Sequence, residues 1–516
     1  MAEKGFWLST AISFQLSAIP NPNTCNSFAK LEKSFILAID IGTSSVRAAL
    51  YDGDANPLPH TSVKLERSFS VTSDGGSELK SLEAFEQVVS VIDAVIEKTA
   101  KIKGEIEYVA SCSFWHSLVG VDDRGNPTPS ILGWADTRSR EYTQILRDRL
   151  NEKEIHNRTG ARFHSSYWPA KLLWLQTEFP SAFERAAGLF SFCDFLALKL
   201  FDEPVTSISM ASGTGLFDVR KCAWDEELLK ELKIKPTLLP AIATSSKIFR
   251  LNTTFAKRWP RLADAQWFPT IADGAADNIG AGCVTASNAA LMIGTSGAMR
   301  VAYSGEPPEE IPEGLWCYRV DQERVIIGGA LSDGGGLYHW LKKNLKLPKD
   351  AEAQISKRPP GGHDLAFLPF LAGERSTGYN EHARGGTFGL TSATDSVDIL
   401  QAALESVAFR FAEICDHLGT VVKIEQIVAS GGALRDSPVW TQIVADVLGR
   451  DLIMNDASES SLRGSVLHAF ECIGKINKIK VSSTAKKRVF TANRDRFDLY
   501  RMARERHSDF YKLPGR

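Results

Sequence analysis

Apolar residues occur along the chain in two patterns, short continuous runs and longer stretches spaced at three and four. The runs at 35–39, 108–111 and 325–327 have the length of strands, and the first is apolar throughout, which is typical of a strand buried on both faces. The stretches 81–103 and 395–417 repeat apolar positions with charges between them and predict amphipathic helices. Strands that alternate with helices indicate an α/β fold.

The apolar run at 35–39 and another that begins at 290 each lead into a turn of glycine and hydroxyl-bearing residues, and a second apolar run follows each turn. The first turn reads Asp-Ile-Gly-Thr-Ser-Ser at 40–45 and is followed by Arg47. The second reads Ile-Gly-Thr-Ser at 293–296 and is followed by Arg300. An ordinary hairpin, in which Asp40 only caps the turn, explains the first one alone. A repeat about 250 residues apart favours two related halves, each beginning with a hairpin that faces phosphate.

Length and charge narrow the class of protein. The 516 residues exceed what one hydrophobic core usually holds, so two large domains are expected. With 60 Lys+Arg against 62 Asp+Glu, the chain shows no electrostatic footprint for nucleic acid or an anionic membrane. No stretch of about 20 apolar residues predicts a transmembrane helix. A small-molecule enzyme is favoured, with neither nucleic acid nor membrane as partner.

Cysteine usage and the first residues bear on the compartment. The eight cysteines include no CxxC pair and no Cys/His cluster, which argues against a disulfide framework and a zinc site. They indicate a reducing, cytoplasmic compartment. Residues 1–33 lack the order of a signal peptide. We expect a disordered leader or a start site placed upstream of the true one, and an organelle-targeting segment stays open although the arginines that would support it are lacking.

Glycines follow apolar strands at four places, which are Gly42, Gly294, 334–336 and 431–432. Several clusters of backbone amides would then converge on one polyphosphate. Neither the P-loop pattern nor the dinucleotide-binding pattern is present at any of the four. The sequence therefore predicts a phosphate site that is built from loops of two domains.

Phosphoryl transfer also needs a metal across the phosphates, a positioned hydroxyl and a carboxylate that accepts its proton. Asp40 has the oxygen chemistry that Mg²⁺ prefers. Asp273 and Asp277 stand out in a stretch of small residues just ahead of the second hairpin. Asp277 is the candidate base because it would lie between the two halves, and its alternative is a turn or helix-start aspartate without chemistry.

The chain resembles the FGGY family of carbohydrate kinases, in the superfamily of actin, hexokinase and the heat-shock ATPases. The motifs that carry the resemblance are Asp-Ile-Gly-Thr-Ser-Ser at 40–45, Asp-Asn at 277–278, Gly-Thr-Ser-Gly at 294–297 and Ser-Gly-Gly-Ala at 430–433. It implies two ribonuclease-H-like domains with mixed sheets flanked by helices and a cleft between them. The expected division is a leader at 1–33, an N-terminal domain with the sugar site at 34–286, and a C-terminal domain with the adenosine site at 287–516.

The resemblance also implies roles for residues, with ATP as co-substrate and Mg²⁺ as metal. Asp277 would remove the proton from a terminal sugar hydroxyl, and Asp40 would organise the metal. The residues expected to bind nucleotide are Gly42, Thr43, Ser44, Arg47, Gly294, Thr295, Gly335, Gly431, Gly432 and Asp436.

Within the family, the stretches 115–118, 134–138, 156–160 and 371–375 look most like the gluconokinase branch. The residues expected to bind the sugar are Trp115, His116, Asp136, Arg138, Arg162 and Asn278. Gluconate needs a cation for its carboxylate, and Arg138, Arg162 and His116 are available. Many relatives have Met where this chain has Trp115, so two alternatives stay open: a kinase of xylulose, ribulose or a pentitol, and a non-catalytic sensor of ATP and sugar. A homodimer also stays open.

Overall fold

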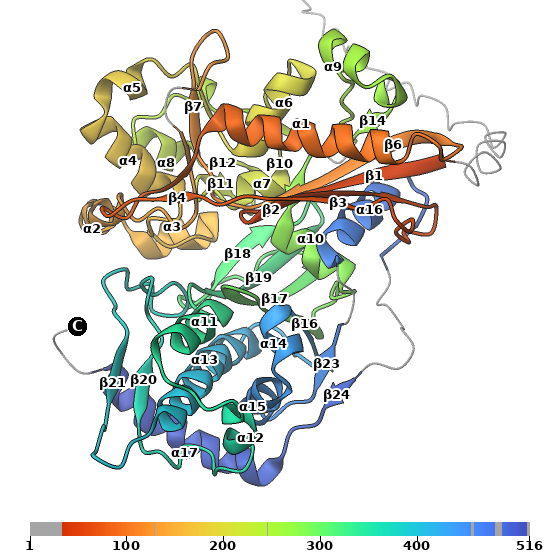
Figure 1. Ribbon diagram of the computed structural model, residues 1–516. Helices are drawn as coiled ribbons and strands as arrows, with labels where there is room; N and C mark the ends of the chain where they lie inside the picture. The colour runs from red at the N-terminus through yellow and green to blue at the C-terminus, as the bar shows by residue number, and fades with distance from the viewer. Residues whose placement is uncertain (1–33, 128–129, 245, 456–458, 480–487, 513–516) are drawn as a thin grey trace, which may run out of the picture.

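The computed structural model describes residues 34–127, 130–244, 246–455, 459–479 and 488–512. The leader expected at 1–33 lies outside the described residues. Two lobes, each built around a mixed β-sheet, stack one above the other (Figure 1). In the described part of the chain, no helix is long and apolar enough to cross a membrane.

The sheet of the N-terminal lobe has the order β14-β6-β1-β2-β3, with β15 paired to β6. Its strands are β1 (Ser34–Ile41), β2 (Ser45–Tyr51), β3 (Val63–Glu66), β6 (Glu105–Ser113), β14 (Gln266–Trp267) and β15 (Ile271–Ala272). β1 and β2 form the predicted antiparallel hairpin, in which Asp40 pairs with Arg47. β6 runs parallel to β1, so both strands deliver their carboxyl ends to the same edge.

Helices and small sheets surround this central sheet. The helices of the N-terminal lobe are α1 (Ser81–Lys98), α2 (Arg140–Arg149), α3 (Glu152–Thr159), α4 (Trp168–Glu178), α5 (Pro180–Glu184), α6 (Phe192–Phe201), α7 (Ile208–Ser212), α8 (Glu226–Glu231), α9 (Thr253–Arg258) and α10 (Asp273–Gly280), with 3₁₀ turns η2 (Pro236–Leu238) and η3 (Pro260–Leu262). The short strands are β4 (Ser70–Val71), β5 (Ser77–Leu79), β7 (Val119–Val121), β8 (Ile131–Leu132), β9 (Gly188–Phe190), β10 (Val205–Ser207), β11 (Phe217–Asp218), β12 (Ala223–Trp224) and β13 (Ala241–Ala243).

The sheet of the C-terminal lobe has the order β18-β19-β17-β16-β22-β23-β24. Its strands are β16 (Asn288–Ile293), β17 (Gly297–Ser304), β18 (Trp316–Arg319), β19 (Arg324–Leu331), β22 (Gln426–Ser430), β23 (Leu452–Met454) and β24 (Val489–Phe490), and a separate pair is formed by β20 (Ala366–Leu368) and β21 (Gly386–Phe388). The later helices are α11 (Gly335–Asn344), α12 (Ala351–Ile355), α13 (Ser396–Gly419), α14 (Gly432–Asp436), α15 (Pro438–Leu448), α16 (Ser460–Cys472) and α17 (Arg494–Tyr511). β16 and β17 form the second predicted hairpin.

The apolar run of β1 is continuous because both of its faces are buried. Leu37 and Ile39 pack into the core under α1, whereas Ile36 and Ala38 pack against α16 on the opposite face. Figure 1 shows α1 and α16 on the two sides of this sheet. In the other lobe, α13 lies over the sheet and contributes most of its length to the core, as its predicted amphipathic pattern requires.

Helix α16 lies in sequence between β23 and β24 of the C-terminal sheet but packs on the sheet of the N-terminal lobe and along α10. The two helices approach so closely that a Cβ atom on Gly464 would lie 1.8 Å from the carbonyl oxygen of Ala276. A Cβ atom on Gly280 would lie equally close to the carbonyl oxygen of Ser460. Glycine at both positions therefore fixes how α10 sits against the hairpin of β1 and β2.

Candidate active site

Asp40 lies at the end of β1 with its side chain almost fully buried. Its Oδ2 accepts hydrogen bonds from Arg47 Nη2 at 2.7 Å and from Ser461 Oγ, at the start of α16, at 2.8 Å. The Cys112 Sγ lies 3.5 Å from Oδ1. Asp40 is thus held by the strand on each side of it and by α16, which fixes the direction of the carboxylate.

Asp277 lies in the second turn of α10 and faces the second hairpin. Its Oδ2 accepts a hydrogen bond from Arg300 Nη2, in β17, at 3.1 Å, and 19% of its side chain stays exposed. Burial raises the pKa of the Asp277 carboxyl above its ordinary value, although Arg300 opposes the shift. A carboxylate that is more basic than usual and still partly accessible has the properties of a general base.

Asp273 is a third carboxylate at this place and begins α10. Burial and the charge of Asp40 raise the pKa of Asp273 to about 7, and Arg300 opposes them. The sequence singles out Asp273 but assigns it no role. In the described part of the chain, the acidic groups do not meet closely enough for three of them to hold one metal ion.

Asn278 points away from these carboxylates. It is fully buried, and its Nδ2 donates to the carbonyl oxygens of Cys283 at 3.3 Å and Arg300 at 3.5 Å. The first bond holds the segment that follows α10, and the second ties α10 to β17. The side chain therefore has a structural task in addition to the sugar-binding role expected for it.

The glycine turns of the C-terminal lobe meet one another. The amide of Gly335 donates to the carbonyl of Gly294 at 2.7 Å, and the amides of Gly334 and Gly336 donate to the carbonyl of Thr295 at 3.1 and 2.9 Å. Gly431 has φ +102°, and a Cβ atom there would lie 2.2 Å from the Ile293 carbonyl oxygen.

The three loops converge, but several of their amides are used to hold the loops together. Gly432, by contrast, is open, with nothing within 4 Å of its Cβ position. Asp436 ends α14 and is exposed, as is Thr295 at the tip of its turn.

The turn of the first hairpin is held by its own backbone and by one arginine. The amide of Gly42 donates to the carbonyl of Ser45 at 2.9 Å, and the carbonyl of Gly42 accepts from Arg67 Nε at 2.9 Å. Thr43 is half-buried and Ser44 is exposed at the tip. Both hydroxyl-bearing residues therefore stand at the surface of the turn, where a phosphate could reach them.

Trp115 and His116 follow β6 and enter a cluster of aromatic rings. The Trp115 ring centroid lies 5.2 Å from that of Tyr318, and the His116 ring lies 5.0 Å from Tyr167. The hydroxyls of Tyr167 and Tyr318 are 2.6 Å apart. Burial lowers the pKa of His116 well below its ordinary value, so the ring is neutral at physiological pH.

The aromatic cluster reaches the carboxylates through Trp115. A Cβ atom on Gly274, in the first turn of α10, would lie 2.5 Å from Cζ3 of Trp115. Aromatic faces and a few polar groups are what a polyhydroxylated ligand needs. Sequence reasoning finds Trp115 and His116 but not Tyr167, Trp316 and Tyr318, because single tyrosines and tryptophans outside a motif carry no functional signal of their own.

The predicted cations of the sugar site already have acidic partners. Arg138 Nη2 lies 2.6 Å from the buried Asp136 and 2.9 Å from Glu78. Arg162 Nη2 lies 2.8 Å from Glu152. Asp136 also accepts the amide of Ser77 at 3.0 Å, so it fixes the strand β5. Another arginine of the quoted motifs, Arg375, lies 5.2 Å from the Trp134 ring and was given no role by the sequence.

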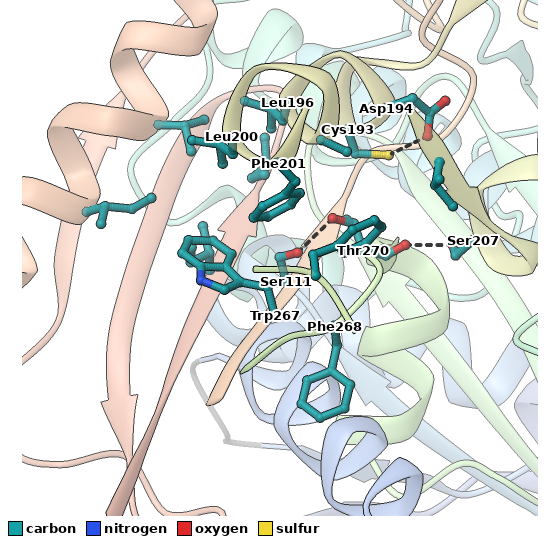
Figure 2. Close-up of a pocket in the computed structure, with 17 residues that line it drawn as sticks. Ser111, Cys193, Asp194, Leu196, Leu200, Phe201, Ser207, Trp267, Phe268 and Thr270 are labelled. Atoms are coloured by element: carbon teal, nitrogen blue, oxygen red, sulfur yellow. Dashed lines mark hydrogen bonds between the residues drawn. The ribbon is translucent and has the colours of Figure 1, made fainter. Parts of the chain in front are cut away.

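A separate cavity lies inside the N-terminal lobe, between the central sheet and α6 (Figure 2). It measures about 30 Å³ and is lined mainly by apolar side chains such as Leu196, Phe201 and Trp267. Its polar groups bond to one another, for example Ser111 to Thr270 at 2.7 Å. The space suits one or two water molecules and not a sugar.

Comparison with known proteins decides the family. Residues 35–261 match the N-terminal domain, and residues 289–471 the C-terminal domain, of the FGGY family of carbohydrate kinases. The chain belongs to this family. It is a sugar kinase with the two-domain fold of the actin and hexokinase type, as predicted, and ATP is the co-substrate of this class.

Relatives with different substrates resemble this FGGY kinase to a similar degree. A gluconokinase of Bacillus licheniformis is 28% identical over 471 residues, covering 87% of this chain and 90% of the relative. The structure of a gluconate kinase from Lactobacillus acidophilus has a TM-score of 0.84 at 26% identity and covers 93% of this chain and 97% of that one. A ligand-bound xylulose kinase of the same organism also has a TM-score of 0.84 at 26% identity, with coverage of 92% and 97%.

Proposed function

We propose that this FGGY kinase transfers the γ-phosphoryl group of ATP to the terminal hydroxyl of a sugar acid, with gluconate as the first candidate. The observation that carries the proposal is Asp277, a buried but accessible carboxylate beside Arg300 at the place where both hairpins and the aromatic cluster meet. The likeness to gluconokinases supports the choice of substrate.

In this reaction Asp277 accepts the proton of the attacking hydroxyl. Burial keeps the carboxylate basic, and the ion pair with Arg300 holds it in one direction. The rings of Trp115, Tyr167 and Tyr318 would pack on the C–H surface of the sugar and keep water from the acceptor position. Water at that position would otherwise hydrolyse ATP.

The carboxylates fit a role for Mg²⁺. The ion is usually bound by one or two carboxylates together with phosphate oxygens and water, so it needs no complete protein cage. Burial and, second, the charge of Asp40 raise the pKa of Asp273 to about 7, and a divalent cation would relieve the repulsion between these two carboxylates. Mg²⁺ bound here would neutralise charge on the transferred phosphoryl group.

The proposal is tested with Asp277→Asn, which keeps the size of the side chain but removes the base. We expect gluconate-dependent release of ADP to fall by about 10²- to 10⁴-fold with the melting temperature preserved. Asp123→Asn, an exposed aspartate in the turn after β7, is the matched control and should keep full activity. Undiminished turnover by Asp277→Asn would remove the assigned base.

A second candidate function is the phosphorylation of a ketopentose, because the xylulose kinase structure matches this chain with the same TM-score as the gluconate kinase. A screen of gluconate, xylulose, ribulose, xylitol and glycerol by ADP release separates the candidates. Preference for a ketose would replace gluconate as substrate. Binding of sugar and ATP in calorimetry without any turnover would instead support a sensor.

A further inference from the structure

A loop of the C-terminal lobe, residues 371–385, reaches across to the aromatic cluster of the N-terminal lobe. Glu381 in this loop accepts the amide of Ser165 at 2.8 Å. The guanidinium of Arg375 in the same loop lies over the Trp134 ring, 5.2 Å from its centroid. The loop therefore carries a cation from one lobe to the sugar side of the other.

The contacts of Arg375 place its charge among the rings of this cluster. Burial raises the pKa of the Tyr167 hydroxyl and the charge of the nearby Arg375 opposes this shift; the Tyr167 ring lies 5.0 Å from that of His116. After burial, the charge of Arg375 is the next cause that lowers the pKa of His116. His116 is neutral, and the Lys171 amine already donates its hydrogen bonds to three backbone carbonyl oxygens. Arg375 is therefore the cation that remains for a ligand at this side of the cluster.

The partners of the other two arginines differ from those of Arg375. Arg138 and Arg162 are held by Asp136 and Glu152, whereas Arg375 has no ion pair with any acidic group in the described ranges of the chain. An arginine with free donors beside neutral hydrogen-bonding rings suits the planar, two-oxygen geometry of a carboxylate.

The order of residues along the cluster matches an open-chain sugar acid. Asp277 lies on α10, whose first turn touches Trp115. The rings continue from Trp115 through Tyr318 to Tyr167, and Arg375 lies at the Tyr167 end. A linear aldonate carries its primary hydroxyl at one end and its carboxylate at the other. The base thus lies on the Trp115 side of the ring cluster and the cation on the Tyr167 side.

We propose that Arg375 binds the carboxylate of the aldonate substrate and selects sugar acids over neutral sugars. This inference rests on the proposed function, since it assigns the far end of the same substrate. It predicts that the motif 371–375 contributes to the sugar site from the C-terminal lobe, and that binding of the acid joins the two lobes.

The test compares gluconate with glucitol, the neutral polyol of the same chain length, in Arg375→Gln, Arg375→Lys and wild type. For Arg375→Gln we expect KM for gluconate to rise about 10- to 100-fold, while any slower turnover of glucitol is unchanged. Arg375→Lys keeps the charge but lacks the planar guanidinium, so its KM for gluconate should lie between the values of wild type and Arg375→Gln. Arg384→Gln, an exposed arginine of the same loop that donates to carbonyls of that loop, is the matched control.

The outcomes separate this inference from the proposed function. If wild type releases no ADP with gluconate, both fail. If wild type uses gluconate and neither Arg375 variant changes KM, the function stands and the inference is overturned. A rise of KM for gluconate in Arg162→Gln but not in Arg375→Gln would also overturn it and assign the carboxylate to Arg162. Equal losses with gluconate and glucitol would make Arg375 a structural residue only.

Discussion

The contact between α10 and α16 is the feature that most directly ties the fold to the reaction, and Gly464→Ala perturbs it. Helix α10 carries Asp273 and Asp277, while the first turn of α16 supplies Ser461 to Asp40. The distance between Asp277 and the first hairpin is thus set by how closely two helix backbones approach.

The size of the perturbation follows from the geometry. A Cβ atom at Gly464 would lie 1.8 Å from the Ala276 carbonyl oxygen and 2.6 Å from its carbon. A carbon and a carbonyl oxygen rarely approach closer than about 3.3 Å. The helices must therefore separate by about 1.5 Å, which is the difference between this limit and the 1.8 Å from the added Cβ atom to the Ala276 oxygen. Such overpacking costs about 1–3 kcal/mol of stability, less what alanine gains over glycine within a helix. A displacement of about 1 Å at the reacting groups lowers turnover by about 10²-fold.

The assay measures kcat and KM for gluconate, the proposed substrate, and for ATP, with the melting temperature of each variant. We expect Gly464→Ala to lose about 10²-fold in kcat and to melt a few degrees lower, while the folded fraction at the assay temperature stays complete. Gly419→Ala is the matched control, because nothing lies within 4 Å of a Cβ atom there. Unchanged kcat in Gly464→Ala would refute the link between helix spacing and catalysis.

Two further predictions concern the carboxylates and the nucleotide loops. The folded-state pKa of Asp273 is raised to about 7, so the protonated carboxyl stabilises the fold at low pH and this contribution is lost as pH rises from about 4 through 7. We therefore expect Asp273→Asn to melt at a higher temperature than wild type. Thermal unfolding at each pH should show that this difference grows between about pH 4 and 7 and is constant above that range. A margin that does not change with pH would contradict the raised pKa of Asp273, which burial and the charge of Asp40 cause. Gly431→Ala forces a side chain into a backbone at φ +102° and against Ile293, so KM for ATP should rise about 10-fold or more while gluconate binding to the free enzyme, measured by calorimetry, is unchanged.

The strands and long helices could be predicted from the sequence because their signals are local. The run at 35–39 is apolar at every position, and the structure explains this by core on both faces of β1. The hairpin at 290–303 was predicted by its likeness to the first one, and β16 and β17 confirm it. The helix expected at 81–103 ends earlier, at Lys98. Thr99 is its C-cap residue, and the Thr99 hydroxyl donates a hydrogen bond to the Val95 carbonyl oxygen. Helix ends depend on such capping bonds more than on apolar period.

The packing of α16 on the N-terminal lobe could not be predicted, because the spacing of its apolar residues would be the same whichever of the two sheets it covered. Leu462 and Val466 would suit the core of either lobe, yet they pack on Ile36 and Ala38. The same limit applies to side-chain partners. The sequence does not predict that Arg138 pairs with Glu78, which lies 60 residues away, or that Arg375 has no acidic partner in the described ranges; only Asp136 is near Arg138 in sequence.

The arginines that follow the two turns show that the repeat carries more than phosphate loops. Arg47 lies opposite Asp40 in the register of its own hairpin and binds it at 2.7 Å. In the second hairpin the pair at this position is Met292 and Ala298, and Arg300 lies two pairs farther from the turn, opposite Ala290. Because that cross-strand position offers no charge, the guanidinium pairs outside the hairpin, with Asp277 on α10 at 3.1 Å. Each hairpin thus places an arginine beside one carboxylate, and the alanine opposite Arg300 leaves that cation available to the proposed base.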